Sequence, residues 1–117
     1  MSKITIYHIP KCKTSRDVLE KIREAGIEPH VVLYLQNPPT ESELRSLIKS
    51  TGESVRYILR QKGTPYDELD LGNSKWTEDE LIAFIMQHPI LLNRPIVSNG
   101  TIARLCRPIE TVQDVLK

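Results

Sequence analysis

Apolar residues in the first third of the chain are spaced first as in a strand, then as in a helix. The β-branched and aromatic run at residues 3–7 (KITIY) predicts a strand, which Pro10 ends. After Cys12, apolar positions recur on one helical face until Gly26, so a helix is expected there. The apolar run at residues 31–35 (VVLYL) predicts a strand covered on both faces. This strand–helix–strand order favours a parallel pair of strands.

The middle of the chain carries two motifs that start helices. Thr40 and Glu43 form a T-x-x-E capping box ahead of apolar positions at helical spacing, and Gly52 is expected to end that helix. Thr77 and Glu80 form a second capping box ahead of another such run. Two helices are therefore predicted between the two halves of the sheet.

The remaining segments predict a short helix, a loop, a hairpin and a last helix. Ser54 can cap the short helix, and the polar stretch 62–75 is expected to be mostly loop. Residues 96–98 and 101–105 flank Asn99-Gly100, which predicts a hairpin with a type I′ turn. The last helix is expected to begin at Pro108.

The predicted elements follow the order β-α-β, a helical insertion, then β-β-α. This is the thioredoxin order, so we expect an α/β fold of three layers, α/β/α, with the insertion between its two halves. The chain has 117 residues, a length typical of one domain with one core. Residues 1–117 are therefore expected to form a single thioredoxin-like domain.

Composition excludes several classes of protein. No apolar run approaches the ~18 residues that a transmembrane helix needs, and the first residues show no signal peptide. Two cysteines are too few for a disulfide scaffold. We therefore expect a cytoplasmic protein with no membrane partner.

The positive charges are concentrated in two stretches that contain no acidic residue. The net charge is +1, but residues 1–16 and 89–109 together carry +7, and the rest of the chain carries −6. If the fold brings these stretches together, they form one electropositive site on an acidic body. The alternative is that short strands simply exclude acidic residues. The overall charge gives no sign of nucleic-acid binding.

Cys12 is the candidate nucleophile. It lies where the first strand is followed by a helix, and unpaired backbone N–H groups at a helix start favour an anion such as a thiolate. Lys11, Lys13 and Arg16 add positive charge nearby. The alternative is an inert, buried thiol. Cys12 and Ser15 form a C-x-x-S motif, so a disulfide formed by Cys12 would need an external thiol.

The second cysteine, Cys106, is expected to be a buried strand residue rather than a resolving thiol. No metal site is expected, because the two thiols and the three histidines lack the paired spacings of zinc sites. The histidines are His8, His30 and His88.

These residues resemble a known family, the glutaredoxin-coupled arsenate reductases of bacteria, over nearly the whole chain. The motifs that carry the resemblance are ITIYH at 4–8, Pro10-x-Cys12-x-Thr14-Ser15-Arg16, Tyr34-Leu35, Ser54-Val55-Arg56 with Leu59-Arg60, Gln87-His88-Pro89-Ile90-Leu91, Asn93-Arg94-Pro95-Ile96-Val97, and Arg104-Leu105-Cys106-Arg107-Pro108. The order and spacing of the motifs match throughout. The resemblance implies a thioredoxin-like fold and a role for particular positions.

The implied roles describe one active site. Cys12 matches the family nucleophile, His8 a histidine that helps to keep the thiol ionised, and Ser15 a hydroxyl that contacts the thiolate. Pro95 matches a proline that follows a cis peptide bond. Three arginines match the oxyanion-binding residues of the family: Arg60, Arg94 and Arg107. Guanidinium groups bind oxyanions bidentately and remain charged. The alternative for each arginine is a solvated surface charge.

The resemblance also implies a catalytic cycle. The thiolate attacks arsenate, glutathione then acts as co-substrate and leaves a mixed disulfide, and glutaredoxin regenerates the thiol. No bound cofactor or metal is needed.

Two departures from the family pattern keep other functions open. Ile9 and Lys13 stand where the family often has Asn and a small residue. They motivate one alternative, a glutathione-dependent thiol oxidoreductase acting on another substrate. A second alternative is a redox-sensing regulator that binds RNA polymerase. Typical regulators of that kind carry C-x-x-C, whereas this chain has Ser15 at the second cysteine position.

Overall fold

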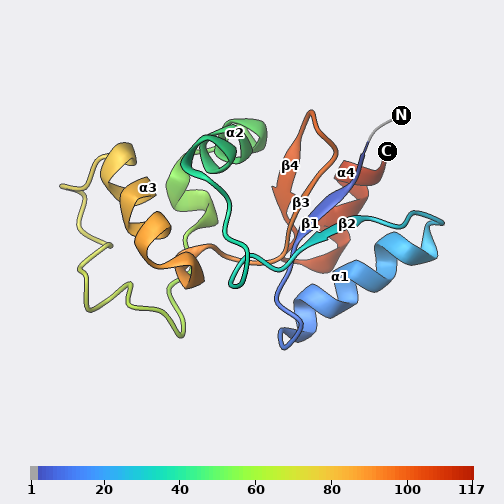
Figure 1. Cartoon of the computed structure of the whole chain (residues 1–117), viewed down its shortest axis with the longest axis horizontal. Coiled ribbons are helices and arrows are strands. Elements are labelled where there is room, and N and C mark those ends of the chain that lie inside the picture. Colours follow the sequence, from blue (N-terminus) through green and yellow to red (C-terminus); the bar gives the residue numbers. More distant parts are fainter. Residues whose placement is uncertain (1–2) are drawn as a thin grey trace.

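The computed structural model describes residues 3–117, which form a four-stranded mixed sheet flanked by helices (Figure 1). The strand order is β2-β1-β3-β4. β1 pairs in parallel with β2 and antiparallel with β3, and β3 pairs antiparallel with β4. The strands are β1 (Thr5–Tyr7), β2 (His30–Val32), β3 (Ile96–Ser98) and β4 (Ala103–Leu105). Because β1 lies beside β3, the two acid-free stretches come together.

Helices cover both faces of the sheet. α1 and the C-terminal α4 share one hydrophobic cluster with the sheet, and α2 shares a second cluster on the other face. α3 contacts α2 and lies at the far end of the molecule from α1 and α4 (Figure 1). The helices are α1 (Lys13–Glu24), α2 (Glu41–Thr51), α3 (Glu78–Gln87) and α4 (Gln113–Leu116), with 3₁₀ turns η1 (Val55–Ile58), η2 (Pro89–Leu91) and η3 (Ile109–Val112). The three-layer, thioredoxin-like fold with its helical insertion is confirmed.

The two capping boxes in the sequence predicted the starts of α2 and α3 correctly. Both capping boxes are complete: the hydroxyls of Thr40 and Thr77 accept hydrogen bonds from the backbone N–H groups of Glu43 and Glu80, whose carboxylates accept from the N-cap N–H groups. Gly52 ends α2 with a φ of +72°. Within residues 3–117, no helix is both long and apolar enough to span a bilayer.

The predicted second strand was wrong at its C-terminal end. β2 ends at Val32, and the chain then turns, with the backbone N–H groups of Gln36 and Asn37 bonded to the Leu33 carbonyl. The apolar run continues past the strand because Tyr34 is buried in the core on the α2 face of the sheet. Hydrophobicity there reflects burial of a turn residue rather than an extended backbone.

The predicted type I′ turn was also wrong. The pairing of Ser98 with Ala103 leaves a four-residue loop at 99–102, all of it described in the structure. Gly100 alone in this loop has a positive φ, of +92°, whereas a type I′ turn needs two such residues. The side-chain oxygen of Asn99 accepts hydrogen bonds from two backbone N–H groups of the loop instead. The hydrogen bonds of the Asn99 side chain therefore stabilise this longer loop.

The last helical segment begins one residue later than predicted, because Pro108 stands just before η3 rather than inside it.

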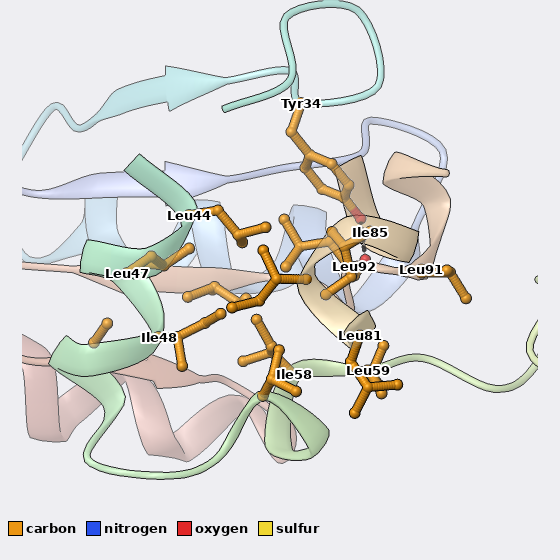
Figure 2. Close-up of a cluster of buried hydrophobic side chains, with 14 of the residues drawn as sticks. Tyr34, Leu44, Leu47, Ile48, Ile58, Leu59, Leu81, Ile85, Leu91 and Leu92 are labelled. Carbon is orange, nitrogen blue, oxygen red and sulfur yellow. Dashed lines mark hydrogen bonds between the residues drawn. The ribbon is translucent and has the colours of Figure 1, made fainter. Parts of the chain in front are cut away.

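The larger hydrophobic cluster joins the helical insertion to the sheet. Figure 2 shows its side chains, which come from α2, η1, α3, η2 and the turn after β2. Leu59 and Leu92, which follow η1 and η2, form an isolated antiparallel bridge within it. This cluster therefore fixes segments 58–60 and 91–94 against one another.

Leu44, which is completely buried, should be essential to this cluster. Leu44→Ala removes buried methyl groups and leaves a cavity, so it should lower the free energy of unfolding by about 2–5 kcal/mol. Leu35→Ala is the matched control, because that side chain is 45% exposed and its loss should change stability by ~0.5 kcal/mol or less. Urea unfolding followed by circular dichroism measures both, and equal losses would contradict this description of the core.

Candidate active site

Cys12 is the N-cap residue of α1, at the end of the loop that follows β1. Its backbone N–H donates to the Ile9 carbonyl at 3.0 Å, and its carbonyl accepts from the Arg16 N–H at 3.0 Å. The thiol is partly exposed. The loop therefore presents the sulfur at the open N-terminal end of the helix, where backbone N–H groups favour negative charge.

The surroundings of Cys12 favour its thiolate form. Partial burial acts to raise the pKa of the thiol, but hydrogen bonds from the Ser15 backbone N–H and from the side chains of Arg94 and Arg107 outweigh it. The pKa of Cys12 is lowered as a result. Nη1 of Arg107 lies 3.9 Å from Sγ. Thiolate character is the property that makes a cysteine nucleophilic.

Arg94 and Arg107 are brought together by the β3–β4 hairpin. Arg94 stands just before β3 and Arg107 just after β4, and the Cys106 N–H donates to the Pro95 carbonyl at 2.9 Å. Nη1 of Arg107 donates to the Arg94 carbonyl at 3.0 Å. The peptide bonds that follow both arginines are cis, as the resemblance implied for the bond before Pro95.

Two nitrogens of Arg94 are left without a partner. Nε and Nη1 are buried, and neither has a hydrogen-bond acceptor within residues 3–117. A buried unsatisfied donor costs about 1–3 kcal/mol, and more when it is charged. Buried polar groups are normally hydrogen-bonded. The two unpaired donors therefore remain available to an acceptor that residues 3–117 do not supply.

Arg60 completes a cluster of three guanidinium groups near the thiol, which we call the arginine clamp: Arg60, Arg94 and Arg107. Arg60 reaches the cluster from the segment after η1. Burial lowers its pKa, and the positive charges of Arg94 and Arg107 lower it further, whereas the nearby thiolate of Cys12 acts in the opposite direction. The clamp is thus a site of mutual positive repulsion, which an anion would relieve.

His8, which follows β1, and Ser15, in the first turn of α1, form a buried hydrogen-bonded pair. His8 Nδ1 and Ser15 Oγ lie 2.6 Å apart, and the Ile9 N–H also donates to Ser15 Oγ at 3.3 Å. Burial lowers the pKa of His8, as do the charges of Arg23 and Arg16, and both effects favour the neutral imidazole. The structure thus connects His8 to Ser15, whose backbone N–H bonds the thiol. The roles that the resemblance gave to both side chains stay predictions.

The ArsC family model matches residues 7–115. The chain belongs to the ArsC family. An arsenate reductase from Escherichia coli is 55% identical over 117 residues, covering 100% of this chain and 83% of that protein. YfgD, an uncharacterised protein from Escherichia coli strain K12, is 42% identical over 115 residues, or 97% of each chain. The solved structure of an arsenate reductase from Vibrio cholerae has a TM-score of 0.92 and 40% identity, covering 97% of this chain and 98% of that one.

Two further residues near the clamp, Tyr34 and Asn93, belong to motifs that carry the resemblance, but the sequence assigned neither of them a role. Tyr34 is completely buried, its hydroxyl donates to the Leu92 carbonyl at 2.6 Å, and burial raises its pKa to about 12. Asn93 accepts hydrogen bonds from Nη1 of Arg60 and from the backbone N–H of Arg94. Both are neutral residues whose position depends on contacts distant in sequence, so spacing alone could not identify them.

Other residues singled out in the sequence lie apart from the clamp. Cys106 is completely buried, which raises its pKa to about 12 and makes it a poor nucleophile. Nη1 of Arg104 donates to the carbonyls of Ala103 and Thr51. Lys13 forms an ion pair with Asp17 at 2.8 Å, and its side chain is 80% exposed. Residues 3–117 contain no cluster of three or more His, Cys, Asp or Glu side chains that could hold a metal ion.

The lowered thiol pKa predicts the pH dependence of alkylation. In a Cys106→Ser background, the rate of Cys12 modification by iodoacetamide should fall as pH drops through the pKa and level off above it. The midpoint should lie below the ~8.5 of a free thiol. Arg107→Ala should move the midpoint upward, because it removes one hydrogen bond to the thiolate. A midpoint at or above that of a free thiol would refute an activated Cys12.

Proposed function

We propose that this chain reduces arsenate to arsenite, with Cys12 as the nucleophile and the arginine clamp as the oxyanion site. The observation that carries the proposal is the pair of buried, unpaired nitrogens on Arg94 beside a thiol of lowered pKa. A tetrahedral oxyanion supplies several acceptors at once. The relatives that are named arsenate reductases support this choice of oxyanion.

In the first step, the Cys12 thiolate attacks arsenic and an S–As bond forms. The bond from arsenic to one of its hydroxyl groups breaks, and the hydroxyl departs as water after taking up a proton. Both reactants are anions, so they repel each other until the clamp compensates their charge. We infer that Arg107 holds thiolate and oxyanion together, and its contacts with the thiol and with the Arg94 carbonyl support this role.

In the second step, glutathione supplies the electrons. Its thiolate attacks the Cys12 sulfur, an S–S bond forms, and the S–As bond breaks with its electron pair on arsenic. Arsenic(V) becomes arsenic(III), and arsenite leaves after protonation. The mixed disulfide stays on Cys12, because Ser15 at the second motif position cannot form a disulfide.

Glutaredoxin then attacks the glutathione sulfur and releases the Cys12 thiolate, which completes the cycle. The only co-substrate needed is glutathione, and no bound cofactor or metal takes part. We place this cycle in the cytoplasm, where glutathione keeps thiols reduced.

A second candidate function is glutathione-dependent reduction of a disulfide substrate. It is favoured by Ile9 and Lys13, which depart from the family pattern. The Lys13 side chain is exposed and paired with Asp17, so we expect it to have little effect on the clamp. Steady-state assays on arsenate and on a glutathione mixed disulfide, run with the same enzyme preparation, separate the two functions.

Cys12→Ser should abolish arsenate-dependent NADPH consumption in an assay coupled to glutathione, glutaredoxin and glutathione reductase. The hydroxyl that replaces the thiol cannot form the S–As and S–S bonds of the cycle. Cys106→Ser should keep the activity, because that thiol is buried and protonated, and should at most reduce stability. Equal loss in both variants would mean that Cys106 takes part in the redox cycle.

Replacing any arginine of the clamp with Ala should reduce kcat/KM for arsenate. Each contact is a charge-assisted hydrogen bond, so we expect a loss of about 1.5–3 kcal/mol, roughly 10- to 150-fold. Arg→Lys should recover only part of this loss, because lysine lacks the planar fork.

Arg104→Ala is the matched control for the clamp. Arg104 bonds backbone carbonyls of β4 and α2 instead of facing Cys12, so its loss should change kcat/KM little. Comparable losses at Arg104 and Arg107 would indicate general surface electrostatics instead of a clamp. High salt is an independent check, because it would weaken a diffuse field more than direct contacts.

A further inference from the structure

Asn93 connects two arginines of the clamp through one side-chain atom. Its Oδ1 accepts a hydrogen bond from Nη1 of Arg60 at 3.2 Å and from the backbone N–H of Arg94 at 3.0 Å. Both neighbours are donors, so the carboxamide must present its oxygen to them. The orientation of the amide is therefore fixed by its surroundings.

The backbone on either side of this contact is held rigidly. The Arg60 N–H donates to the Leu91 carbonyl and the Asn93 N–H to the Ile58 carbonyl, both at 2.8 Å, around the bridge between Leu59 and Leu92. The side chains of this bridge are part of the buried cluster in Figure 2. Asn93 is therefore placed by a ladder that joins the two segments bearing Arg60 and Arg94.

Within residues 3–117, the Arg60 guanidinium makes one other hydrogen bond, which Nε donates to the Lys62 carbonyl at 3.1 Å. Lys62 lies in the exposed loop that precedes α3. A single contact leaves a guanidinium free to swing about that bond, whereas two contacts on different nitrogens define its plane. The second hydrogen bond, which Arg60 donates to Asn93, is thus the one that orients the Arg60 guanidinium relative to the rest of the clamp.

We propose that Asn93 is a positioning residue that aligns the Arg60 guanidinium with Arg94 so that both bind one substrate oxyanion. This inference rests on the proposed function of the clamp. A neutral acceptor suits the task, because a carboxylate at this position would hold Arg60 equally well but would neutralise its charge and repel the substrate. Asn93 orients the cation and leaves its charge for the anion.

The test compares four variants of the full chain: Asn93→Ala, Asn93→Asp, Arg60→Ala, and the double variant of Asn93→Ala with Arg60→Ala. Asn93→Ala should lower kcat/KM for arsenate about 3- to 15-fold, mainly through a higher KM, because one hydrogen bond that orients Arg60 is lost. In the double variant, Asn93→Ala should add less than about 2-fold to the loss caused by Arg60→Ala, because the two residues act as a unit.

Asn93→Asp distinguishes orientation from charge. It retains the acceptor, so the variant should fold, but its KM for arsenate should exceed that of the Asn93→Ala variant. The alkylation midpoint of Cys12 in the Asn93→Ala variant should match that of the unaltered chain, because the groups that lower the thiol pKa are Ser15, Arg94 and Arg107. That readout shows that the thiol environment is intact while substrate binding is weakened.

Asn99→Ala is the matched control, since this asparagine also accepts two hydrogen bonds through one oxygen, in the β3–β4 loop. It should lose stability and keep kcat/KM. The proposal fails if Asn93→Ala is as active as the unaltered chain, if its loss is undiminished in the Arg60→Ala background, or if Asn93→Asp binds arsenate as well as the unaltered chain. If Arg60→Ala itself is fully active, the proposed clamp is wrong, which is a separate result.

Discussion

The repulsion among three guanidinium groups is the constraint on which the rest of the site depends. Burial and the charges of its two neighbours lower the pKa of Arg60, a sign that these cations are held closer together than they would be in water. Side-chain attraction cannot hold like charges together, so the backbone must. It does so with the bridge between Leu59 and Leu92 and with the β3–β4 hairpin, which positions Arg94 and Arg107.

The hydrophobic cores make that arrangement possible. The insertion that carries Arg60 shares a buried cluster with the sheet and with the segment before Arg94, and the bond from Tyr34 to the Leu92 carbonyl joins the turn after β2 to the same segment. The smaller cluster under α1 fixes the helix whose N-terminus presents Cys12. Apolar burial therefore offsets the electrostatic cost of gathering the cations, which is how strained functional sites are generally maintained.

Local signals allowed much of this to be predicted from the sequence. Neighbouring residues are enough to predict the capping boxes at Thr40 and Thr77 and the position of Cys12 at a helix start. The order of the elements is enough to predict that the two acid-free stretches meet. The end of β2, the four-residue hairpin loop and the parts played by Tyr34 and Asn93 were beyond reach. Tyr34 and Asn93 depend on partners far along the chain, as when Tyr34 bonds the Leu92 carbonyl 58 residues away. The hairpin loop depends on side-chain hydrogen bonds of Asn99 that its Asn-Gly pair does not specify.

Charge balance relates the resting site to the proposed cycle. Before substrate binds, the Cys12 thiolate is the anion that the structure places against the clamp, and it acts to raise the pKa of Arg60 against the other arginines. In the proposed cycle, attack on arsenic consumes that thiolate but delivers an oxyanion to the same cations, so the clamp keeps an anion through this step. Departure of arsenite then leaves a neutral mixed disulfide on Cys12, so at this stage of the proposed cycle the clamp has neither thiolate nor oxyanion beside it. Under this proposal the uncompensated clamp attracts an incoming anion most strongly at the stage when the proposed glutaredoxin thiolate approaches.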